Sequence, residues 1–173
     1  MAYTLRTAGP EDVGQIAEVL HEGFVGYRAF APPDWEPPDP RTNLDALRER
    51  LSSPDVWCLL AEENGAPAGH ISVMPAVKHD SFPSTDPALA HLWQLFVRPP
   101  WQGTGLATTL HAEALRETGA RGFSAIRLYT PAAQVRARRF YEREGWATAG
   151  PPIEDTDFGL PLVEYRRAIS ISV

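Results

Sequence analysis

The sequence is poor in residue types that would point to special kinds of protein. It has one cysteine, Cys58, so no disulfide framework stabilises it, and the apolar neighbours of this cysteine predict a small buried side chain. Its apolar runs stop at about five residues, short of the roughly 20 that a membrane-spanning helix needs. The N-terminus lacks a basic start followed by an apolar core, so we expect a cytoplasmic protein with no membrane partner.

Positive charge is also scarce. Sixteen basic residues stand against 22 acidic ones, which gives a net charge of -6. A chain with this balance lacks the positive field that collects nucleic acid, so nucleic acid is not an expected partner. The composition is otherwise that of a globular protein, with 43% hydrophobic and 22% charged residues over 173 positions. This length predicts one domain, residues 1–173, with a core that needs no metal or disulfide.

The first half of the chain combines strand and helix patterns with a long loop. Five prolines lie between residues 31 and 40 and forbid both a helix and a central strand, so a loop is predicted there. Apolar residues at helical spacing predict helices, and two short runs around residues 63–66 predict a hairpin. The predicted elements are a strand at 5–7, helices at 13–20 and 42–51, and strands at 56–62 and 68–74.

From residue 92 the pattern changes to strand, glycine turn, helix, strand and helix. Such a close succession predicts a parallel strand pair joined by a right-handed crossover. The last helix should end at Gly145, because glycine suits a left-handed cap. After a predicted loop at 76–90, the elements are strands at 92–97, 125–129, 146–149 and 162–167 and helices at 105–118 and 134–144. The sequence thus predicts an α+β fold with a mixed sheet.

The turn before the helix at 105–118 is a candidate phosphate site. Its glycines, Gly103 and Gly105, free the backbone just where the helix starts. The first turn of a helix leaves about four N–H groups without partners, and its dipole favours an anion. A Walker A loop would need a Gly-Lys-Ser/Thr end, and a dinucleotide turn would need a glycine where Thr108 stands. Neither pattern fits, which leaves a simple helix cap or another kind of phosphate turn.

Two segments together resemble a known family. The pattern Gln102-x-x-Gly105-x-Ala107 follows a strand, and the segment Phe140-Tyr141-Glu142-Arg143-Glu144-Gly145-Trp146 comes about 35 residues later. Both segments resemble signatures of the GNAT superfamily of N-acetyltransferases. The first is similar to that family's pyrophosphate turn for coenzyme A, and the second to its Phe/Leu-Tyr-Glu-x-x-Gly-Phe segment. The order of the predicted elements is also similar.

The resemblance implies a fold and an activity. The fold would be an α+β sandwich with a mixed, mostly antiparallel sheet of six or seven strands, helices on both faces, and a central parallel strand pair splayed at the cofactor cleft. The activity would be transfer of an acetyl group from acetyl-CoA to a primary amine, with no metal. The proline-rich loop favours a small-molecule acceptor, and the alternatives are a protein N-terminus or lysine, or a non-catalytic acyl-CoA sensor. A homodimer is a further expectation from the family.

The resemblance also implies which residues hold the coenzyme. The main chain of residues 95–97 would bind pantetheine as an added strand does, and the following turn would hold the pyrophosphate. Gln134 stands where the family often has asparagine, and its amide can make the same kinds of hydrogen bond. Arg138 is the candidate for the ribose phosphate. The full set is Leu95, Phe96, Val97, Gln102, Gly103, Thr104, Gly105, Leu106, Ala107, Gln134 and Arg138.

Two residues are candidates for acid–base chemistry. Tyr141 matches the family's general acid, which would protonate the leaving thiolate, or else it is an aromatic ring that packs on Ala137. A base must take the proton of the attacking amine, and His91 is the candidate because imidazole titrates near neutrality. His70 is the alternative base, and each histidine has a purely structural alternative.

By the same resemblance, the acceptor pocket would be built from residues 24–40 and 76–90. The first segment carries four aromatic residues and three acids, which suit an amine with an apolar body. The alternative is that the aromatic residues anchor the proline-rich loop to the core. The residues in question are Phe24, Tyr27, Phe30, Trp35, Asp34, Glu36 and Asp39.

Overall fold

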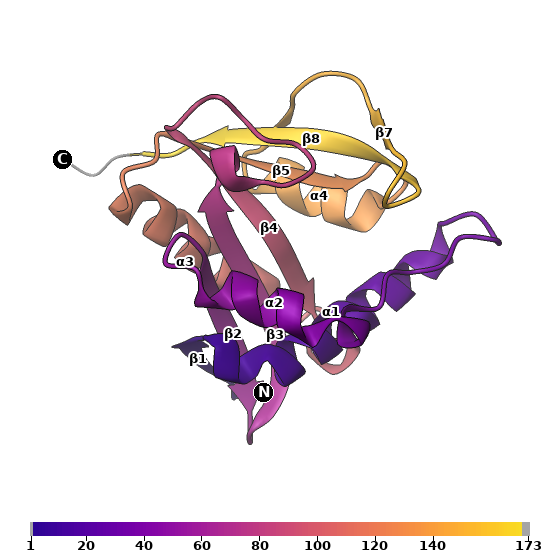
Figure 1. Cartoon of the computed structure of the whole chain (residues 1–173), viewed down its shortest axis with the longest axis vertical. Helices are drawn as coiled ribbons and strands as arrows, with labels where there is room; N and C mark the ends of the chain where they lie inside the picture. The colour runs from indigo at the N-terminus through magenta and orange to yellow at the C-terminus, as the bar shows by residue number, and fades with distance from the viewer. Residues whose placement is uncertain (1, 171–173) are drawn as a thin grey trace.

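The computed structural model describes residues 2–170, and their strands form one eight-stranded sheet in the order β1-β2-β3-β4-β5-β8-β6, with β7 beside β8 (Figure 1). The strands are β1 (Thr4–Thr7), β2 (Trp57–Glu63), β3 (Ala66–Pro75), β4 (Leu89–Val97), β5 (Ala125–Pro131), β6 (Ala147–Thr148), β7 (Ile153–Asp155) and β8 (Leu160–Ala168). The α-helices are α1 (Val13–Gly26), α2 (Leu44–Ser52), α3 (Leu106–Ala120) and α4 (Val135–Arg143). The predicted fold class is confirmed.

Helices cover both faces of the sheet. Successive side chains of a strand point to opposite faces, and along β2 Leu59 and Leu60 belong to two different apolar clusters. The cluster around Leu59 includes the buried leucines of α3, whereas the cluster around Leu60 includes those of α1 and α2. Burial of each such side chain contributes about 1.5–3 kcal/mol, so the two clusters fix the helices against the sheet.

The central strands β4 and β5 are parallel, and they separate partway along. They pair at only three positions, the last being His91 with Arg127. Beyond this point β4 continues along β3 and β5 continues along β8, and Figure 1 shows the two halves of the sheet turning away from each other. Trp93 is an extra residue in β4, because Leu92 and Gln94 pair with consecutive residues of β3. The predicted splay of the parallel pair is thus confirmed.

Three differences from the predicted elements bear on the site. Strand β4 begins at Leu89, inside the predicted loop 76–90, so His91 lies within the strand and not at its start. Helix α1 runs on to Gly26, and Gly23 lets this part of the helix pack closely on β4, because a Cβ there would lie 2.1 Å from Cδ1 of Phe96. The short strand β7 was not predicted, since three residues are too few for a pattern.

The predicted end of the last helix is confirmed. Gly145, just after α4, has a φ of 88°, as a left-handed cap requires.

Candidate active site

The turn before α3 presents a row of main-chain donors. Gly103 and Gly105 have φ angles of 76° and 87°, and a Cβ at either residue would meet open space, so the backbone angle and not crowding requires glycine. The first main-chain bond of the helix runs from the amide of Thr109 to the carbonyl of Gly105. The amides of residues 103–108 therefore donate to no acceptor among the described residues. These N–H groups and the helix dipole together suit a diphosphate.

Side-chain hydrogen bonds connect this turn to β4 and to α4. The amide nitrogen of Gln102 donates to the carbonyl of Val97 at 3.0 Å, and Arg136 Nη1 donates to the amide oxygen of Gln102 at 2.8 Å. Thr104 donates its hydroxyl to the carbonyl of Trp101 at 2.5 Å. Arg136 on α4 was missed by the sequence analysis, because nothing in a run of arginines tells which one faces the turn. The exposed glycine turn is thus tied to both β4 and α4.

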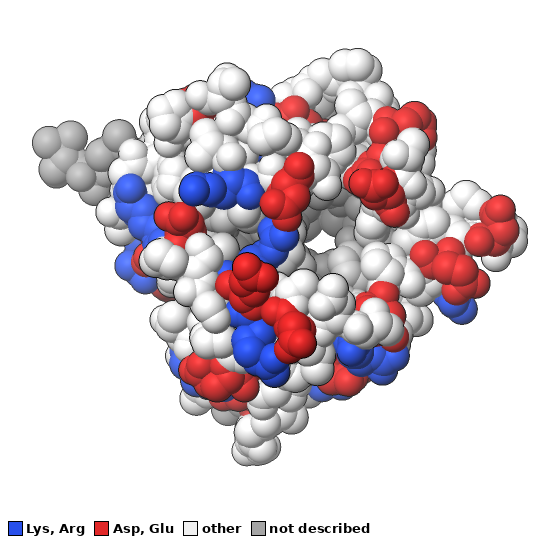
Figure 2. All heavy atoms as spheres, in the orientation of Figure 1, with Lys and Arg blue, Asp and Glu red and all other residues white. Residues whose placement is uncertain are grey.

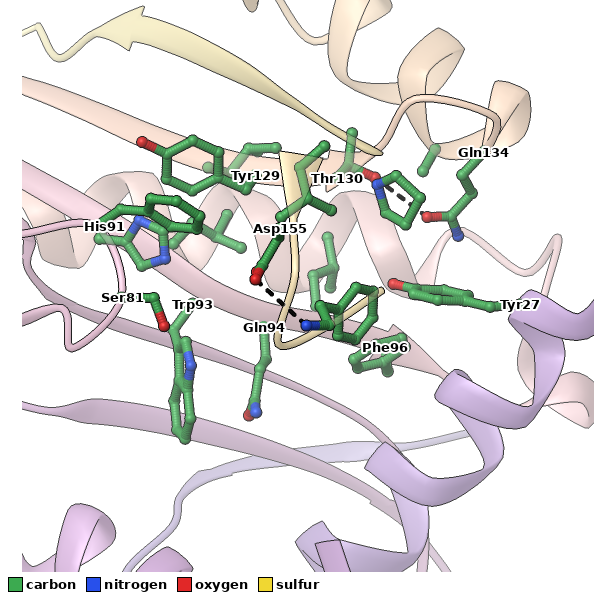
Figure 3. Close-up of a pocket in the computed structure, with 18 of the residues that line it drawn as sticks. Tyr27, Ser81, His91, Trp93, Gln94, Phe96, Tyr129, Thr130, Gln134 and Asp155 are labelled. Atoms are coloured by element: carbon green, nitrogen blue, oxygen red, sulfur yellow. Dashed lines mark hydrogen bonds between the residues drawn. The ribbon is translucent and has the colours of Figure 1, made fainter. Parts of the chain in front are cut away.

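A cavity of about 270 Å³ lies where β4 and β5 separate. Its walls include Leu95 and Phe96 from β4, Thr130 from β5, Gln134 just before α4 and Tyr141 on α4. Figure 3 labels Phe96, Thr130 and Gln134 among them. The pairing of β4 with β5 ends at His91, so the edge of residues 95–97 that faces the cleft carries no strand partner. The cleft therefore offers free main-chain groups next to side chains of α4, as the predicted pantetheine contact requires.

Tyr141 is a buried residue of α4 whose side chain reaches the cavity. It is 7% exposed, and its ring packs against Phe140, Trp146 and Tyr165. Burial raises the pKa of its phenol above the usual value, so the hydroxyl keeps its proton at neutral pH. Ala137, one turn earlier, lines the same cavity. The ring of Tyr141 thus packs in the core and also lines the cleft. The two alternatives for this residue, a general acid and a packing aromatic ring, therefore do not exclude each other.

Gln134 lies at the start of α4, with its amide oxygen 3.1 Å from the hydroxyl of Thr130. Both residues line the cavity, and Figure 3 shows their hydrogen bond at one end of it. Because Thr130 uses the amide oxygen, the amide N–H groups of Gln134 are left to point elsewhere. The amide of Gln134 thus lies beside the cleft, and its contact with the coenzyme stays a prediction.

Arg138 turns away from the glycine turn. Its Nε donates to the hydroxyl of Tyr165 at 3.0 Å, and its Nη1 donates to the carbonyl of Ala132 at 3.0 Å. Tyr165 in turn donates to Glu142 at 2.8 Å, so these groups join α4 to β8. The contact of Arg138 with the ribose phosphate stays a prediction, and Arg136 is the arginine of α4 that lies next to the glycine turn.

His91 lies at the opposite end of the cavity from Gln134 (Figure 3). It is 2% exposed, and its Nδ1 accepts a hydrogen bond from Arg127 Nε at 3.3 Å. Burial holds the pKa of this imidazole well below its usual range, so the ring is neutral. Its role as a base stays a prediction, and the bond from Arg127 works against it because that bond uses one ring nitrogen.

His70, the alternative base, lies inside the sheet. It is fully buried, its Nδ1 is 3.3 Å from Cys58 Sγ, and it does not line the cavity. Burial lowers the pKa of His70 to about 4 and raises that of Cys58 to about 12. The two side chains are a neutral buried pair, as expected for structural residues, and the prediction that Cys58 is buried is confirmed.

The aromatic residues before and within the proline-rich loop divide into two groups. Phe24 and Tyr27 line the cavity, whereas Trp35 is 8% exposed and donates its indole N–H to the carbonyl of Phe158 at 2.8 Å. Phe158 lies in the turn between β7 and β8 and contacts the rings of Phe24, Tyr27 and Trp35. Trp35 therefore anchors the loop, and Phe24 and Tyr27 form a wall of the site.

Comparison with known proteins agrees with this geometry. The sequence model of the acetyltransferase (GNAT) family matches residues 24–146. An acetyltransferase of the GNAT family from Staphylococcus aureus Mu50 superimposes with a TM-score of 0.73 at 14% identity, over 98% of this chain and 100% of that chain. The PaiA N-acetyltransferase from Thermoplasma acidophilum, solved with coenzyme A, gives 0.70 at 20% identity, over 95% and 98%.

A third similar structure is the ribosomal-protein-S18-alanine N-acetyltransferase from Escherichia coli. Its TM-score is 0.69 at 17% identity, over 99% of this chain and 97% of that chain. At such identities these likenesses show the fold, and no curated protein matches the sequence. Within residues 2–170, no helix is both long and apolar enough to cross a membrane.

Proposed function

The chain belongs to the acetyltransferase (GNAT) family, and we propose that, as an acetyl-CoA-dependent N-acetyltransferase, it acts on the primary amine of a small molecule. The observation that carries this proposal is the cavity at the point where β4 and β5 separate, with a protonated tyrosine on one wall. The proline-rich loop and the turn between β7 and β8 meet beside this cavity, which supports an enclosed acceptor over a protein chain.

The coenzyme fits two features of the described residues. The six unpartnered amides of residues 103–108 match the needs of a pyrophosphate, and the free edge of residues 95–97 matches the amides of pantetheine. Arg136 and Gln102 hold the turn in the conformation that presents these amides. Acetyl-CoA supplies an activated acetyl thioester to the cleft.

Tyr141 serves as the general acid. The nitrogen of the amine bonds to the acetyl carbon, the bond from that carbon to sulfur breaks, and the thiolate takes the proton of the Tyr141 hydroxyl. A thiol has a pKa near 8.5, so its thiolate leaves readily and needs little help from a strong acid. The amine nitrogen gives up one proton to solvent and the Tyr141 phenolate takes one back from solvent, so the net products are the acetylated amine and free coenzyme A. Burial then keeps the Tyr141 phenol protonated between turnovers.

The amine must be neutral when it attacks, although an alkylamine has a pKa near 10.4. Two residues that line the cavity bear on the amine: Asp155 on its binding and His91, which stays the predicted base, on the removal of its proton. Asp155 is a carboxylate that attracts the ammonium form into the cavity. A homodimer and a cytoplasmic location stay predictions.

Release of free thiol tests the proposal. The protein is mixed with acetyl-CoA and a panel of small primary amines, and thiol appearance is followed for wild type and Tyr141→Phe. Amine-dependent thiol release that Tyr141→Phe strongly reduces supports the proposal. Release with peptide amines alone would favour a protein acceptor, and tight acetyl-CoA binding without any release would favour a sensor.

A further inference from the structure

A buried arginine lies next to the end of the cavity that His91 occupies. Arg127 on β5 is 4% exposed, and it forms no ion pair with a carboxylate of residues 2–170. Its three hydrogen bonds go to neutral groups, namely Nδ1 of His91, the hydroxyl of Tyr129 and the carbonyl of Phe82. A buried charge without an opposite charge is costly, so such a residue suggests that a ligand supplies the missing anion.

One acid, Glu164, lies near Arg127 but does not neutralise it by direct contact. Glu164 faces Tyr129 across the pairing of β5 with β8, and its charge acts on Arg127. Its carboxylate, however, pairs with Arg166 at 2.6 Å. The hydrogen bonds of Arg127 therefore go to neutral groups, and the three residues that accept them, His91, Tyr129 and Phe82, line the cavity.

The bond from Arg127 fixes the proton of His91. An arginine side chain has only donors, so Nδ1 of His91 must accept, and the neutral ring carries its proton on Nε2. His79 is fixed in the same way, because its Nδ1 accepts from the main-chain N–H of Phe82 at 3.0 Å. The two rings lie 4.3 Å apart, both line the cavity, and neither Nε2 has a hydrogen-bond partner among the described residues. This end of the cavity thus presents two N–H donors.

The local field also favours an anion over a cation. Burial lowers the pKa of His91 most, and the neighbouring His79, Arg127 and Arg50 lower it further. The same two arginines, after burial, lower the pKa of His79 to about 4, while nearby acids act in the opposite direction. Both imidazoles are therefore neutral donors held in a positive field.

Acids lie on the other side of the same space. Asp155 lines the same cavity, and its Oδ1 accepts the main-chain N–H groups of Asp157 at 3.0 Å and Phe158 at 3.3 Å (Figure 3). Figure 2 shows a hollow near the middle of the face that it draws, with Asp and Glu side chains on both sides of it and Lys or Arg side chains also beside it. A ligand in this space meets a carboxylate on one side and N–H donors on the other.

We propose that His79, His91 and Arg127 form a carboxylate-binding subsite, and that the acceptor is a small molecule with a carboxylate close to its primary amine. His91 and His79 donate to the carboxylate, and Arg127 acts through them as a positioning residue. Asp155 attracts the ammonium group, and Phe24 and Tyr27 contact the apolar body. This inference rests on the proposed function, and it gives His91 a binding role in place of the predicted base.

Matched acceptors test the subsite. L-phenylalanine and L-phenylalaninamide have nearly the same shape but differ in the charge of one group, and 2-phenylethylamine lacks that group. We expect wild type to acetylate the amino acid with a kcat/KM about 10- to 100-fold above that of the amide or the amine, the size of effect that one or two charge-assisted hydrogen bonds give. Equal or better use of the uncharged acceptors would overturn the subsite while leaving the proposed function intact.

Variants test whether the preference for the amino acid over its amide depends on the proposed subsite. Arg127→Met fills the buried space without a charge, and His91→Leu removes one donor, so both should abolish the preference for the acid over the amide. His91→Gln keeps an N–H donor and should retain part of the preference, chiefly through KM, which neither a purely structural histidine nor a base would do. An unchanged preference in a folded Arg127→Met or His91→Leu protein would contradict the assignment.

Binding to wild type gives a readout that needs neither turnover nor a variant. Calorimetry with the coenzyme A-bound protein compares N-acetyl-L-phenylalanine with N-acetyl-L-phenylalaninamide. Tighter binding of the acid by about tenfold supports the subsite, and equal or absent binding of the acid overturns it. Absence of thiol release with every amine would reject the proposed function by itself, so the two failures are distinguishable.

Discussion

Arg136 on α4 donates a hydrogen bond to the side chain of Gln102 at 2.8 Å, and Gln102 in turn donates to the carbonyl of Val97 at 3.0 Å. This chain connects the helix that carries Tyr141 to the turn with the unpartnered amides. The position of the proposed general acid and the shape of the phosphate site are therefore linked by one continuous set of contacts.

Arg136→Ala should weaken coenzyme A binding by about 3- to 10-fold, because loss of a charge-assisted hydrogen bond loosens the turn. Calorimetry with coenzyme A at two salt concentrations measures the effect. Arg139→Ala is the matched control, since Arg139 is exposed on the same helix and makes no hydrogen bond to the described residues. Equal binding by both variants and wild type would remove Arg136 from the site.

Tyr141→Phe should lower kcat by about 100-fold or more, the usual contribution of a general acid, with little change in coenzyme A affinity. Burial raises the pKa of Tyr141, so the acid form persists above pH 10, where an ordinary tyrosine loses its proton. The pH profile of wild type should therefore show no alkaline loss from this group below about pH 10. Unchanged turnover in a folded Tyr141→Phe protein would contradict the role.

Trp35→Phe should loosen the proline-rich loop without opening the core. The substitution keeps an aromatic ring in the cluster and removes the hydrogen bond to the carbonyl of Phe158, so we expect a loss of about 1–2 kcal/mol of stability. Denaturant unfolding measures the loss, and the KM for the acceptor should rise more than that for acetyl-CoA. A KM change confined to acetyl-CoA would show that the loop does not border the acceptor.

Asp12→Asn should change how stability depends on pH. Hydrogen bonds from Arg6, at 2.7 and 2.9 Å, hold the pKa of the Asp12 carboxyl below its usual value. The unfolded chain then binds more protons, so this stabilisation is complete above about pH 4 and is lost as the pH falls through the lower folded pKa. Denaturation at pH 7 and pH 3 should show a smaller difference for Asp12→Asn than for wild type, and an equal difference would contradict the assignment.

The sequence predicts most of the fold because its patterns are local. Val13, Ile16 and Leu20 have helical spacing, and all three are buried on α1. The glycines at 103 and 105 mark a turn that only a left-handed backbone can make, and both have positive φ. The end of α1 was missed, and the close contact of Gly23 with the ring of Phe96 could not be predicted either, because Phe96 lies on a strand far along the chain.

The candidate site is less predictable for the same reason. Arg136 and Arg138 are equivalent in a run of arginines, and only the packing of α4 shows that the first reaches Gln102 and the second reaches Tyr165. No sequence pattern indicated a functional role for Arg127, because it becomes a buried charge only once β5 pairs with β4 and β8. Such residues depend on contacts between segments far apart in the chain, which local spacing does not encode.

A crystal structure with acetyl-CoA bound tests the central claim most directly. The account predicts the pyrophosphate on the amides of residues 103–108 and the thioester sulfur within hydrogen-bonding reach of the Tyr141 hydroxyl, about 3–3.5 Å away. A pyrophosphate bound elsewhere, or a thioester sulfur far from Tyr141, would contradict it.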